Sequence, residues 1–227
     1  MPVRPKAVLF DLDGVLLDTE PLYTAATQAV VSKYGRNYDF SLKRRIMGGS
    51  AMVGAKIVVA ELGLPITPMQ YLDERRQYLN DLFLSTQAIE GAERLVQTLA
   101  AKGYPLAVAT SSERQLFELK TRPHAWFSLF TKVVCGDDPR IAAPKPAPFI
   151  FLLAASELGI SANECVAFED SPAGVNAAHA AGCKVIARRD PQLSEDELRH
   201  ACRIIMRYDE LDLETFPETI SNPVRAN

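Results

Sequence analysis

The feature that most constrains the fold of this chain is a series of short apolar runs separated by segments of helical periodicity. The first run, residues 7–10, stops abruptly at Asp11. Such runs are typical of strands that are buried on both faces of a parallel sheet. Further runs follow at residues 105–109, 132–135, 165–168, 184–187 and 204–206. Because helical segments lie between the strands, the sequence predicts an α/β fold with a doubly wound, Rossmann-like parallel sheet.

Two of the intervening helical segments carry clear end signals. Before residue 105, apolar residues recur at helical spacing and Gly103 follows as a C-terminal stop. In a later segment, Ser171 can cap a helix, Pro172 suits its first turn, and Gly182 ends it. These signals support helices between the predicted strands.

The stretch from about residue 21 to residue 88 breaks this alternation, because it contains helical patterns alone. One apolar stripe ends near Gly35, and a second helix opens with Thr67-Pro68-Met69-Gln70, which has the form of a capping box. A purely helical insert after the first strand predicts a separate cap. We therefore expect an α/β core made of residues 1–18 and 89–227, and a small all-helical cap domain at residues 19–88.

Composition excludes several classes of function. The formal net charge is −3 and no basic patch suggests nucleic acid binding. We expect no signal peptide in the first residues, and the longest apolar run, residues 149–155, is too short to span a bilayer. The four cysteines form no C-x-x-C pair, so buried free thiols are expected. We expect a cytoplasmic protein, monomeric by default, with no nucleic acid or membrane partner.

Polar residues follow the predicted strands at the edge where open α/β sheets bind ligands. The first strand ends in two aspartates, the second in hydroxyl side chains, and a later one in two acids, while a lysine is expected at the start of a helix. These candidate site residues are Asp11, Asp13, Thr110, Ser111, Glu169, Asp170 and Lys145.

Four carboxylates at one edge would repel one another unless a cation lay among them, and oxygen ligands suit Mg²⁺. That charge is what phosphoryl transfer requires. A carboxylate such as Asp11 can attack phosphorus, and a second acid such as Asp13 can move the proton. In an extended chain these two side chains would point the same way. The sequence thus favours metal-assisted phosphoryl transfer.

Four segments, in this order, resemble the motifs of the haloacid dehalogenase-like phosphatases. They are Asp11-Leu12-Asp13-Gly14-Val15-Leu16-Leu17-Asp18-Thr19-Glu20, Val108-Ala109-Thr110-Ser111-Ser112, Lys145-Pro146-Ala147-Pro148, and Phe168-Glu169-Asp170-Ser171-Pro172-Ala173-Gly174. The resemblance covers nearly the whole chain. The segments Gly136-Asp137-Asp138-Pro139 and Met47-Gly48-Gly49-Ser50 are most similar to the pseudouridine-5'-phosphatase and beta-phosphoglucomutase-like branch.

The resemblance implies a role for each matching residue. Asp11 would be the nucleophile and a metal ligand, and Asp13 the general acid and base, with its backbone carbonyl on Mg²⁺. The transferring phosphoryl group would be held by Thr110, Ser111 and Lys145. Asp170 would bind Mg²⁺ directly, and Glu169 directly or through water. Glu20, Gly48 and Gly49 would face the substrate from the cap.

Two positions depart from the family pattern. An aspartate usually follows the third motif, where this chain has Phe149. Related enzymes often carry Arg or Lys just after the cap glycines, where this chain has Ser50 and Ala51, and the nearest cation is Lys56. A second, distal phosphate therefore has no obvious partner in this loop.

Plainer interpretations exist for single features. The basic run 43–45 is expected to be a solvated helix face, and Arg188 a solvated sheet edge. The leading hypothesis is a Mg²⁺-dependent phosphatase for a small phosphorylated metabolite, a sugar phosphate or a nucleoside monophosphate such as pseudouridine 5'-phosphate. A sugar phosphomutase is the alternative. A non-catalytic protein that binds a phosphorylated ligand is a third, although the residues it would have lost are all present.

Overall fold

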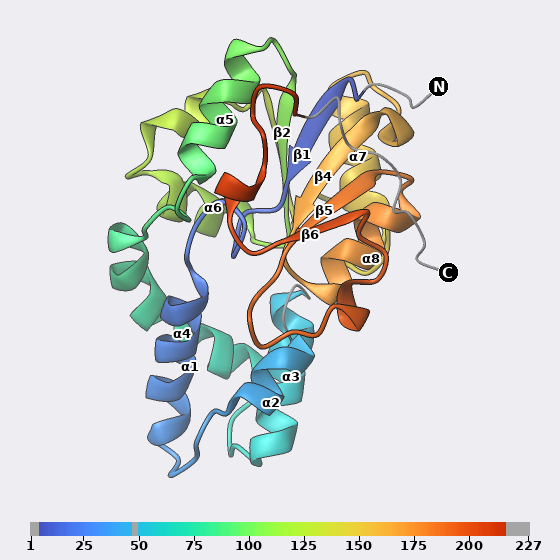
Figure 1. Ribbon diagram of the computed structural model, residues 1–227. Helices are drawn as coiled ribbons and strands as arrows, with labels where there is room; N and C mark the ends of the chain where they lie inside the picture. Colours follow the sequence, from blue (N-terminus) through green and yellow to red (C-terminus); the bar gives the residue numbers. More distant parts are fainter. Residues whose placement is uncertain (1–4, 47–49, 217–227) are drawn as a thin grey trace.

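The computed structural model describes residues 5–46 and 50–216, and it consists of a sheet with helices on both faces above a smaller group of helices (Figure 1). The strands are β1 (Ala7–Phe10), β2 (Leu106–Thr110), β3 (Lys132–Cys135), β4 (Cys165–Glu169), β5 (Lys184–Arg188) and β6 (Arg203–Ile205). Neighbouring strands pair in parallel, in the order β3-β2-β1-β4-β5-β6. This is the doubly wound sheet that the apolar runs predict.

The order of the strands changes direction at β1. From β1 the chain builds β2 and β3 on one side, and then returns to build β4, β5 and β6 on the other. Phe10 at the end of β1 pairs with Val108 of β2 and with Phe168 of β4. The residues that follow these strands therefore emerge together, at the switch point where such sheets bind ligands.

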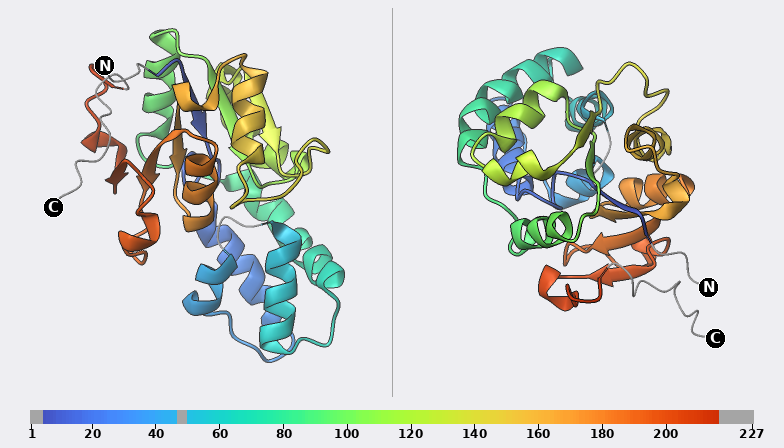
Figure 2. Two further views of the ribbon diagram at one scale, coloured as in Figure 1. Left: turned by 90° about the vertical axis from the view of Figure 1, so that its right-hand side faces the viewer. Right: turned by 90° about the horizontal axis from the view of Figure 1, so that it is seen from above.

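Alternate side chains of the strands enter two apolar cores, one on each face of the sheet. On β1, Val8 and Phe10 belong to one core, and Ala7 and Leu9 to the other. The core helices are α5 (Ala92–Ala101), α6 (Arg114–Thr121), α7 (Phe149–Glu157) and α8 (Pro172–Ala180), and the 3-10 turns are η2 (Ala125–Leu129), η3 (Ala162–Glu164), η4 (Asp196–Leu198) and η5 (Tyr208–Glu210). Helix α5 covers the face of Val8, whereas α7 and α8 cover the face of Ala7 (Figure 2).

The inserted segment is helical throughout and has an apolar core of its own. Its elements are α1 (Glu20–Ser32), α2 (Phe40–Ile46), α3 (Ala51–Leu62), α4 (Pro68–Leu82) and η1 (Phe83–Ser85). Val30, Val58 and Tyr71 are fully buried at its centre. A second cluster brings Phe83 against Leu116 of the sheet domain. We call residues 20–85 the cap; its independence as a domain with the boundaries given above stays a prediction.

The local signals in the sequence mark the helix ends. The capping box at Thr67 and Gln70 forms, and Ser171 Oγ accepts a hydrogen bond from the Gly174 backbone at 3.0 Å. Helix α5 ends before Gly103, whose φ of 80° is a left-handed conformation. The strands differ from prediction by about a residue: β6 begins at 203 rather than 204, and β4 extends to Glu169.

The cysteines agree with the expectation of free thiols. Cys135, Cys165 and Cys183 are buried, Cys202 is half-buried, and none forms a disulfide. Within the described ranges, no helix combines the length and the apolar character that crossing a bilayer requires.

Candidate active site

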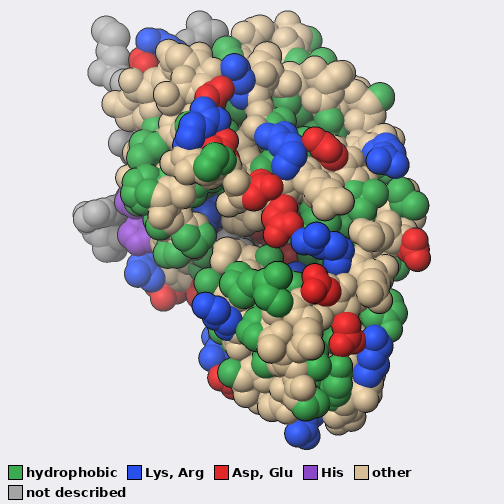
Figure 3. All heavy atoms as spheres, turned by 180° about the vertical axis from the view of Figure 1, so that it is seen from behind, with side chains coloured by type: hydrophobic (Ala, Val, Ile, Leu, Met, Phe, Trp, Pro, Cys, Tyr) green, Lys and Arg blue, Asp and Glu red, His purple; other side chains and the backbone are tan. Residues whose placement is uncertain are grey.

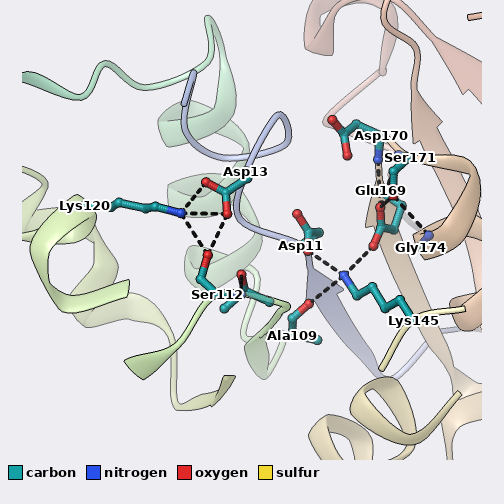
Figure 4. Close-up of polar contacts among 11 residues, drawn as sticks. Asp11, Asp13, Ala109, Ser112, Lys120, Lys145, Glu169, Asp170, Ser171 and Gly174 are labelled. Carbon is teal, nitrogen blue, oxygen red and sulfur yellow. Dashed lines mark hydrogen bonds and ion pairs between the residues drawn. The ribbon is translucent and has the colours of Figure 1, made fainter. Parts of the chain in front are cut away.

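Lys145 joins three segments of the core at the switch point. Its ammonium donates hydrogen bonds to Asp11 Oδ1 at 2.5 Å, to Glu169 Oε1 at 2.6 Å and to the carbonyl of Ala109 at 3.1 Å (Figure 4). The side chains of Lys145, Asp11 and Glu169 are all buried. Burial alone would lower the pKa of Lys145, but the two carboxylates raise it above its usual range. The lysine therefore stays charged and holds Asp11 and Glu169 side by side.

The position of Lys145 corrects one expectation. The residue lies in the loop before α7, not at the start of that helix, since α7 begins at Phe149. The helix has no side-chain cap, because Pro148 precedes it and Phe149 stands where the family has an aspartate. Lys145 nevertheless contacts Asp11, so the departure at residue 149 does not displace the lysine.

Glu169 is fixed by the start of α8. Its Oε2 accepts hydrogen bonds from the backbone N–H groups of Asp170 and Ser171, at 3.0 and 3.3 Å, and from Ser171 Oγ at 3.2 Å. The carboxyl group packs directly on Gly174, where a Cβ atom would lie 1.9 Å from Glu169. With Oε1 bonded to Lys145, both oxygens are engaged. Gly174 is therefore required for the position of this acid.

Asp11, Glu169 and Asp170 form an acidic cluster, in which one carboxylate oxygen from each residue lies within 4.8 Å of the other two. The side chain of Asp170 packs on Gly14, where a Cβ would lie 1.9 Å from Oδ2 and φ is 76°. Burial raises the pKa of Asp11 to about 7, with Lys145 opposing and Glu169 and Asp13 adding to the shift. Burial and the neighbouring Glu169 also raise the pKa of Asp170.

The chemistry of this cluster fits a divalent cation. The raised pKa values of Asp11 and Asp170 mean that the positive charge nearby does not fully stabilise their ionised forms in this buried position. The described residues donate no hydrogen bond to the carboxylate of Asp170, although it is buried. An all-oxygen donor set with negative charge is what Mg²⁺ binds in proteins. Asp11 and Asp170 are thus available as ligands, whereas Glu169 is already bonded on both oxygens.

Asp13 belongs to a neighbouring network rather than to the cluster. Lys120 Nζ donates to Oδ1 and Oδ2 of Asp13, at 2.6 and 2.8 Å, Ser112 Oγ donates to Oδ2 at 2.8 Å, and Thr19 Oγ1 donates to Oδ1. Burial would raise the pKa of Asp13, but Lys120 and these hydrogen bonds outweigh it and lower the pKa. The network thus favours the carboxylate form.

Asp11 and Asp13 both line the cavity described below, but their carboxylates have different partners. Strand β1 ends at Phe10 and the backbone turns at Gly14, whose N–H donates to the carbonyl of Leu17 at 2.9 Å. The two carboxylates therefore bond with different lysines, as Figure 4 shows.

Sequence reasoning missed Lys120. This lysine is fully buried on α6, and its ammonium also lies 4.7 Å from the ring centre of Tyr23 and 4.9 Å from that of Phe83, both in the cap. A signal was present: Lys120 falls four residues after Leu116 and three after Phe117, on the apolar stripe of the helix. A lysine on such a stripe needs a partner in the interior.

The second motif contributes in two different ways. Thr110, at the end of β2, is fully buried, and its Oγ1 accepts a hydrogen bond from the backbone N–H of Ser112 at 3.1 Å. Ser111 lies in the wall of the cavity described next. Their binding of a phosphoryl group stays a prediction.

A cavity of about 130 Å³ lies between the cap and the carboxyl ends of the strands. The core contributes Asp11, Asp13, Ser111, Ser112, Glu113, Leu116 and Asp170, and the cap contributes Glu20, Tyr23, Thr27, Tyr38, Lys43, Ile46, Ser50, Ala51, Gly54 and Arg75. Acidic and basic side chains gather around a hollow where the cap meets the core (Figure 3). Glu20 is in the cavity wall as its motif predicts, whereas Gly48 and Gly49 lie outside the described residues.

Two basic residues expected at solvated surfaces contribute to the site instead. Lys43 lies in the cavity wall and pairs with Glu20 at 3.2 Å. Arg188 is half-buried and donates a hydrogen bond to the carbonyl of Gly14 at 2.9 Å. Both were misjudged because their partners are distant in sequence: Gly14 is 174 residues from Arg188.

Comparison with known proteins agrees with this geometry. The family model of the haloacid dehalogenase-like hydrolases matches residues 8–188. A Drosophila melanogaster protein named "Probable pseudouridine-5'-phosphatase" is 40% identical over 212 residues, 92% of each chain. The (DL)-glycerol-3-phosphatase 2 of Arabidopsis thaliana is 39% identical over 192 residues, 82% of this chain and 80% of the plant protein.

A solved structure has the same architecture. CbbY from Rhodobacter sphaeroides, in complex with xylulose-(1,5)bisphosphate, superimposes with a TM-score of 0.78 at 25% identity, over 92% of this chain and 96% of that chain. The chain therefore belongs to the haloacid dehalogenase-like hydrolase family and is an enzyme of that family, as its four motifs indicate.

Proposed function

We propose that this enzyme is a Mg²⁺-dependent phosphatase that hydrolyses a small phosphate monoester through a phosphorylated Asp11. The observation that carries the proposal is the buried carboxylate of Asp11, which Lys145 contacts at 2.5 Å and which belongs to the acidic cluster at the switch point of the sheet. This arrangement supports the proposal, because phosphoryl transfer needs a nucleophile, a cation for the phosphoryl oxygens and metal ligands close together.

The proposed metal ligands are Asp11, Asp170 and the backbone carbonyl of Asp13. Glu169 would contact the metal through water, because its own oxygens are bonded to Lys145 and to the start of α8. The bound Mg²⁺ would neutralise the acids and the negative charge of the phosphate.

In the first step, a carboxylate oxygen of Asp11 attacks phosphorus and the bond from phosphorus to the leaving oxygen breaks. Asp13 gives its proton to that oxygen. The Lys120 network favours ionised Asp13, but the approach of an anionic phosphate raises the pKa of a nearby carboxyl group and so favours the proton. Lys145, Thr110 and Ser111 hold the phosphoryl oxygens as their charge is redistributed.

In the second step, water attacks the phosphorus of the aspartyl phosphate. Asp13, now a carboxylate, takes a proton from the water, the bond between phosphorus and Asp11 breaks, and inorganic phosphate leaves. Lys120 and Ser112 hold Asp13 in this carboxylate form, with the hydrogen bonds given above. Asp13 thus serves both steps by gaining and losing one proton.

The substrate class follows from the relatives and from the cap. The names of the relatives refer to pseudouridine 5'-phosphate and glycerol 3-phosphate. We propose a sugar phosphate, a polyol phosphate or a nucleoside monophosphate, with the leaving group in the cavity beneath the cap.

Phosphate release from a panel of such monoesters tests the proposal. Release with Mg²⁺ should stop on chelation and in Asp11→Asn, a nearly isosteric change that removes the nucleophile. Unchanged release by Asp11→Asn would contradict the mechanism. Isomerisation of a sugar phosphate without net release, dependent on a bisphosphate activator, would instead support the mutase alternative.

A further inference from the structure

Arg75 is a basic residue of the cavity wall whose charge the described residues leave unpaired. It lies on α4, in the same wall as Glu20 and Lys43. No Asp or Glu of the described chain forms an ion pair with it, and its Nε is buried without a hydrogen-bond partner. An unpaired buried donor of this kind costs free energy. The guanidinium charge in the cavity wall is also offset by no carboxylate of the described residues.

The neighbouring cations are already neutralised. Lys43 pairs with Glu20 at 3.2 Å. Arg76, next in sequence, pairs with Glu113 at 2.9 Å. Among the described residues, Arg75 has aromatic neighbours instead of an acidic partner.

Two rings hold the guanidinium in place. Its central carbon lies 5.4 Å from the ring centre of Tyr23 and 5.4 Å from that of Tyr71. Tyr71 is itself fixed, because it is fully buried and its hydroxyl lies 3.1 Å from Thr27 Oγ1. A guanidinium held between rings loses little conformational freedom on binding, and its planar fork matches the two oxygens of a carboxylate or phosphate.

We propose that Arg75 binds a second oxyanion on the leaving group of the substrate, remote from the phosphoryl group that is transferred. This inference rests on the proposed function and narrows its substrate class to monoesters that also carry a carboxylate or another phosphate. Arg75 takes the place of the cation that is missing at Ser50 and Ala51, from a different helix of the cap.

The size of the cavity limits the leaving group. About 130 Å³ is well below the roughly 300–1,000 Å³ of sites for drug-sized ligands. A leaving group of a few carbon atoms, with its anion at the far end, suits this space. The binding chemistry is the same for a carboxylate and a phosphate, so both are tested.

The test uses two pairs of compounds that differ only in the second anion. Glycerol 3-phosphate is compared with glycerate 3-phosphate, and propane-1,3-diol monophosphate with the bisphosphate. We expect kcat/KM of the native enzyme to favour the anionic member of at least one pair. Arg75→Gln should lower kcat/KM for that member by about 10- to 100-fold, the range for a charge-assisted contact, and leave the neutral member within about twofold.

Two further variants make the result specific. Arg75→Lys keeps the positive charge but loses the planar guanidinium. It should therefore retain part of the preference in kcat/KM for the anionic member, and its activity shows that a variant at this position folds. Arg45→Gln is a matched control, because Arg45 is exposed on α2 and pairs with Glu61 at 3.1 Å. It should change neither member of a pair.

Equal losses on both members in Arg75→Gln would limit Arg75 to a structural role and overturn the inference. No preference for either anion in the native enzyme would also overturn it. Failure of the proposed function is distinguishable, because no phosphate monoester of the wider panel would then be hydrolysed. Calorimetric binding to Asp11→Asn would still test Arg75, with tighter binding of the anionic member expected only while Arg75 is present.

Discussion

Replacing Lys120 by methionine tests whether this lysine acts through Asp13. Methionine keeps most of the volume and removes the ammonium, which donates to both oxygens of Asp13 at 2.6 and 2.8 Å and to Ser112 Oγ at 2.8 Å. Breaking a buried ion pair by removing one partner costs about 3–5 kcal/mol. The side chain of Lys120 is 0% exposed but that of Asp13 is 19% exposed, so water can partly solvate the abandoned carboxylate.

We therefore expect the low end of that range, a loss of about 3 kcal/mol in the free energy of unfolding. For a chain of this size, this corresponds to a fall in Tm of about 6–12 °C. Activity should fall by about 10²- to 10⁴-fold in kcat, the contribution of a positioned general acid and base. Lys56→Met, at an exposed position of α3, is the control and should change neither quantity.

A double-mutant cycle separates the ion pair from packing. Adding Asp13→Asn removes the carboxylate that Lys120→Met leaves unpaired, so the two stability losses should be non-additive by about 2 kcal/mol, measured by urea unfolding. Losses that add within about 0.5 kcal/mol would refute the reasoning. Lys120 would then act through its contacts with Tyr23 and Phe83.

Two further predictions concern the acidic cluster. Gly174→Ala places a Cβ 1.9 Å from the Glu169 carboxyl group. The overpacking should lower the free energy of unfolding by about 1–3 kcal/mol and weaken Mg²⁺ binding about 10- to 100-fold. An unchanged calorimetric affinity for Mg²⁺ would contradict this account. In the metal-free protein, folding raises the pKa of Asp11 from 3.8 to about 7, so the folded state keeps a proton that the unfolded state has lost. The free energy of unfolding should therefore fall as the pH rises from about 4 to about 7, by about 4 kcal/mol from Asp11 alone. In urea titrations, Mg²⁺ should therefore stabilise the protein more at pH 8 than at pH 5, and equal stabilisation at both pH values would oppose the proposed ligands.

Much of the fold follows from local patterns. Strands buried on both faces must be apolar throughout, so runs such as residues 7–10 are visible in the sequence. Thr67 and Ser171 cap helix starts: Thr67 forms a capping box with Gln70, and the Ser171 side chain accepts a hydrogen bond from the backbone N–H of Gly174. The sequence displays both capping residues. The carboxyl ends of parallel strands meet, so the convergence of Asp11 and Glu169 could be predicted from strand order. Lys145 lies in the loop before α7, and its place beside them was expected from the third motif.

The residues that were missed have long-range partners. Lys120 meets Asp13 across 107 residues, and Arg188 meets Gly14 across 174. No spacing rule connects such pairs, and a lysine or arginine taken alone is expected at the surface. Arg75 was missed for a related reason: its charge is unpaired in the described chain, so no sequence neighbour identifies it.

The most direct test of the central claim is to trap the covalent intermediate. Native enzyme and Asp11→Asn are mixed with Mg²⁺ and a good phosphate monoester substrate, quenched in acid during turnover, and digested for mass spectrometry. The account predicts one added phosphoryl group on Asp11 of the native enzyme and none in the variant. A phosphoryl group on any other residue, or release of phosphate at the native rate by Asp11→Asn, would contradict it.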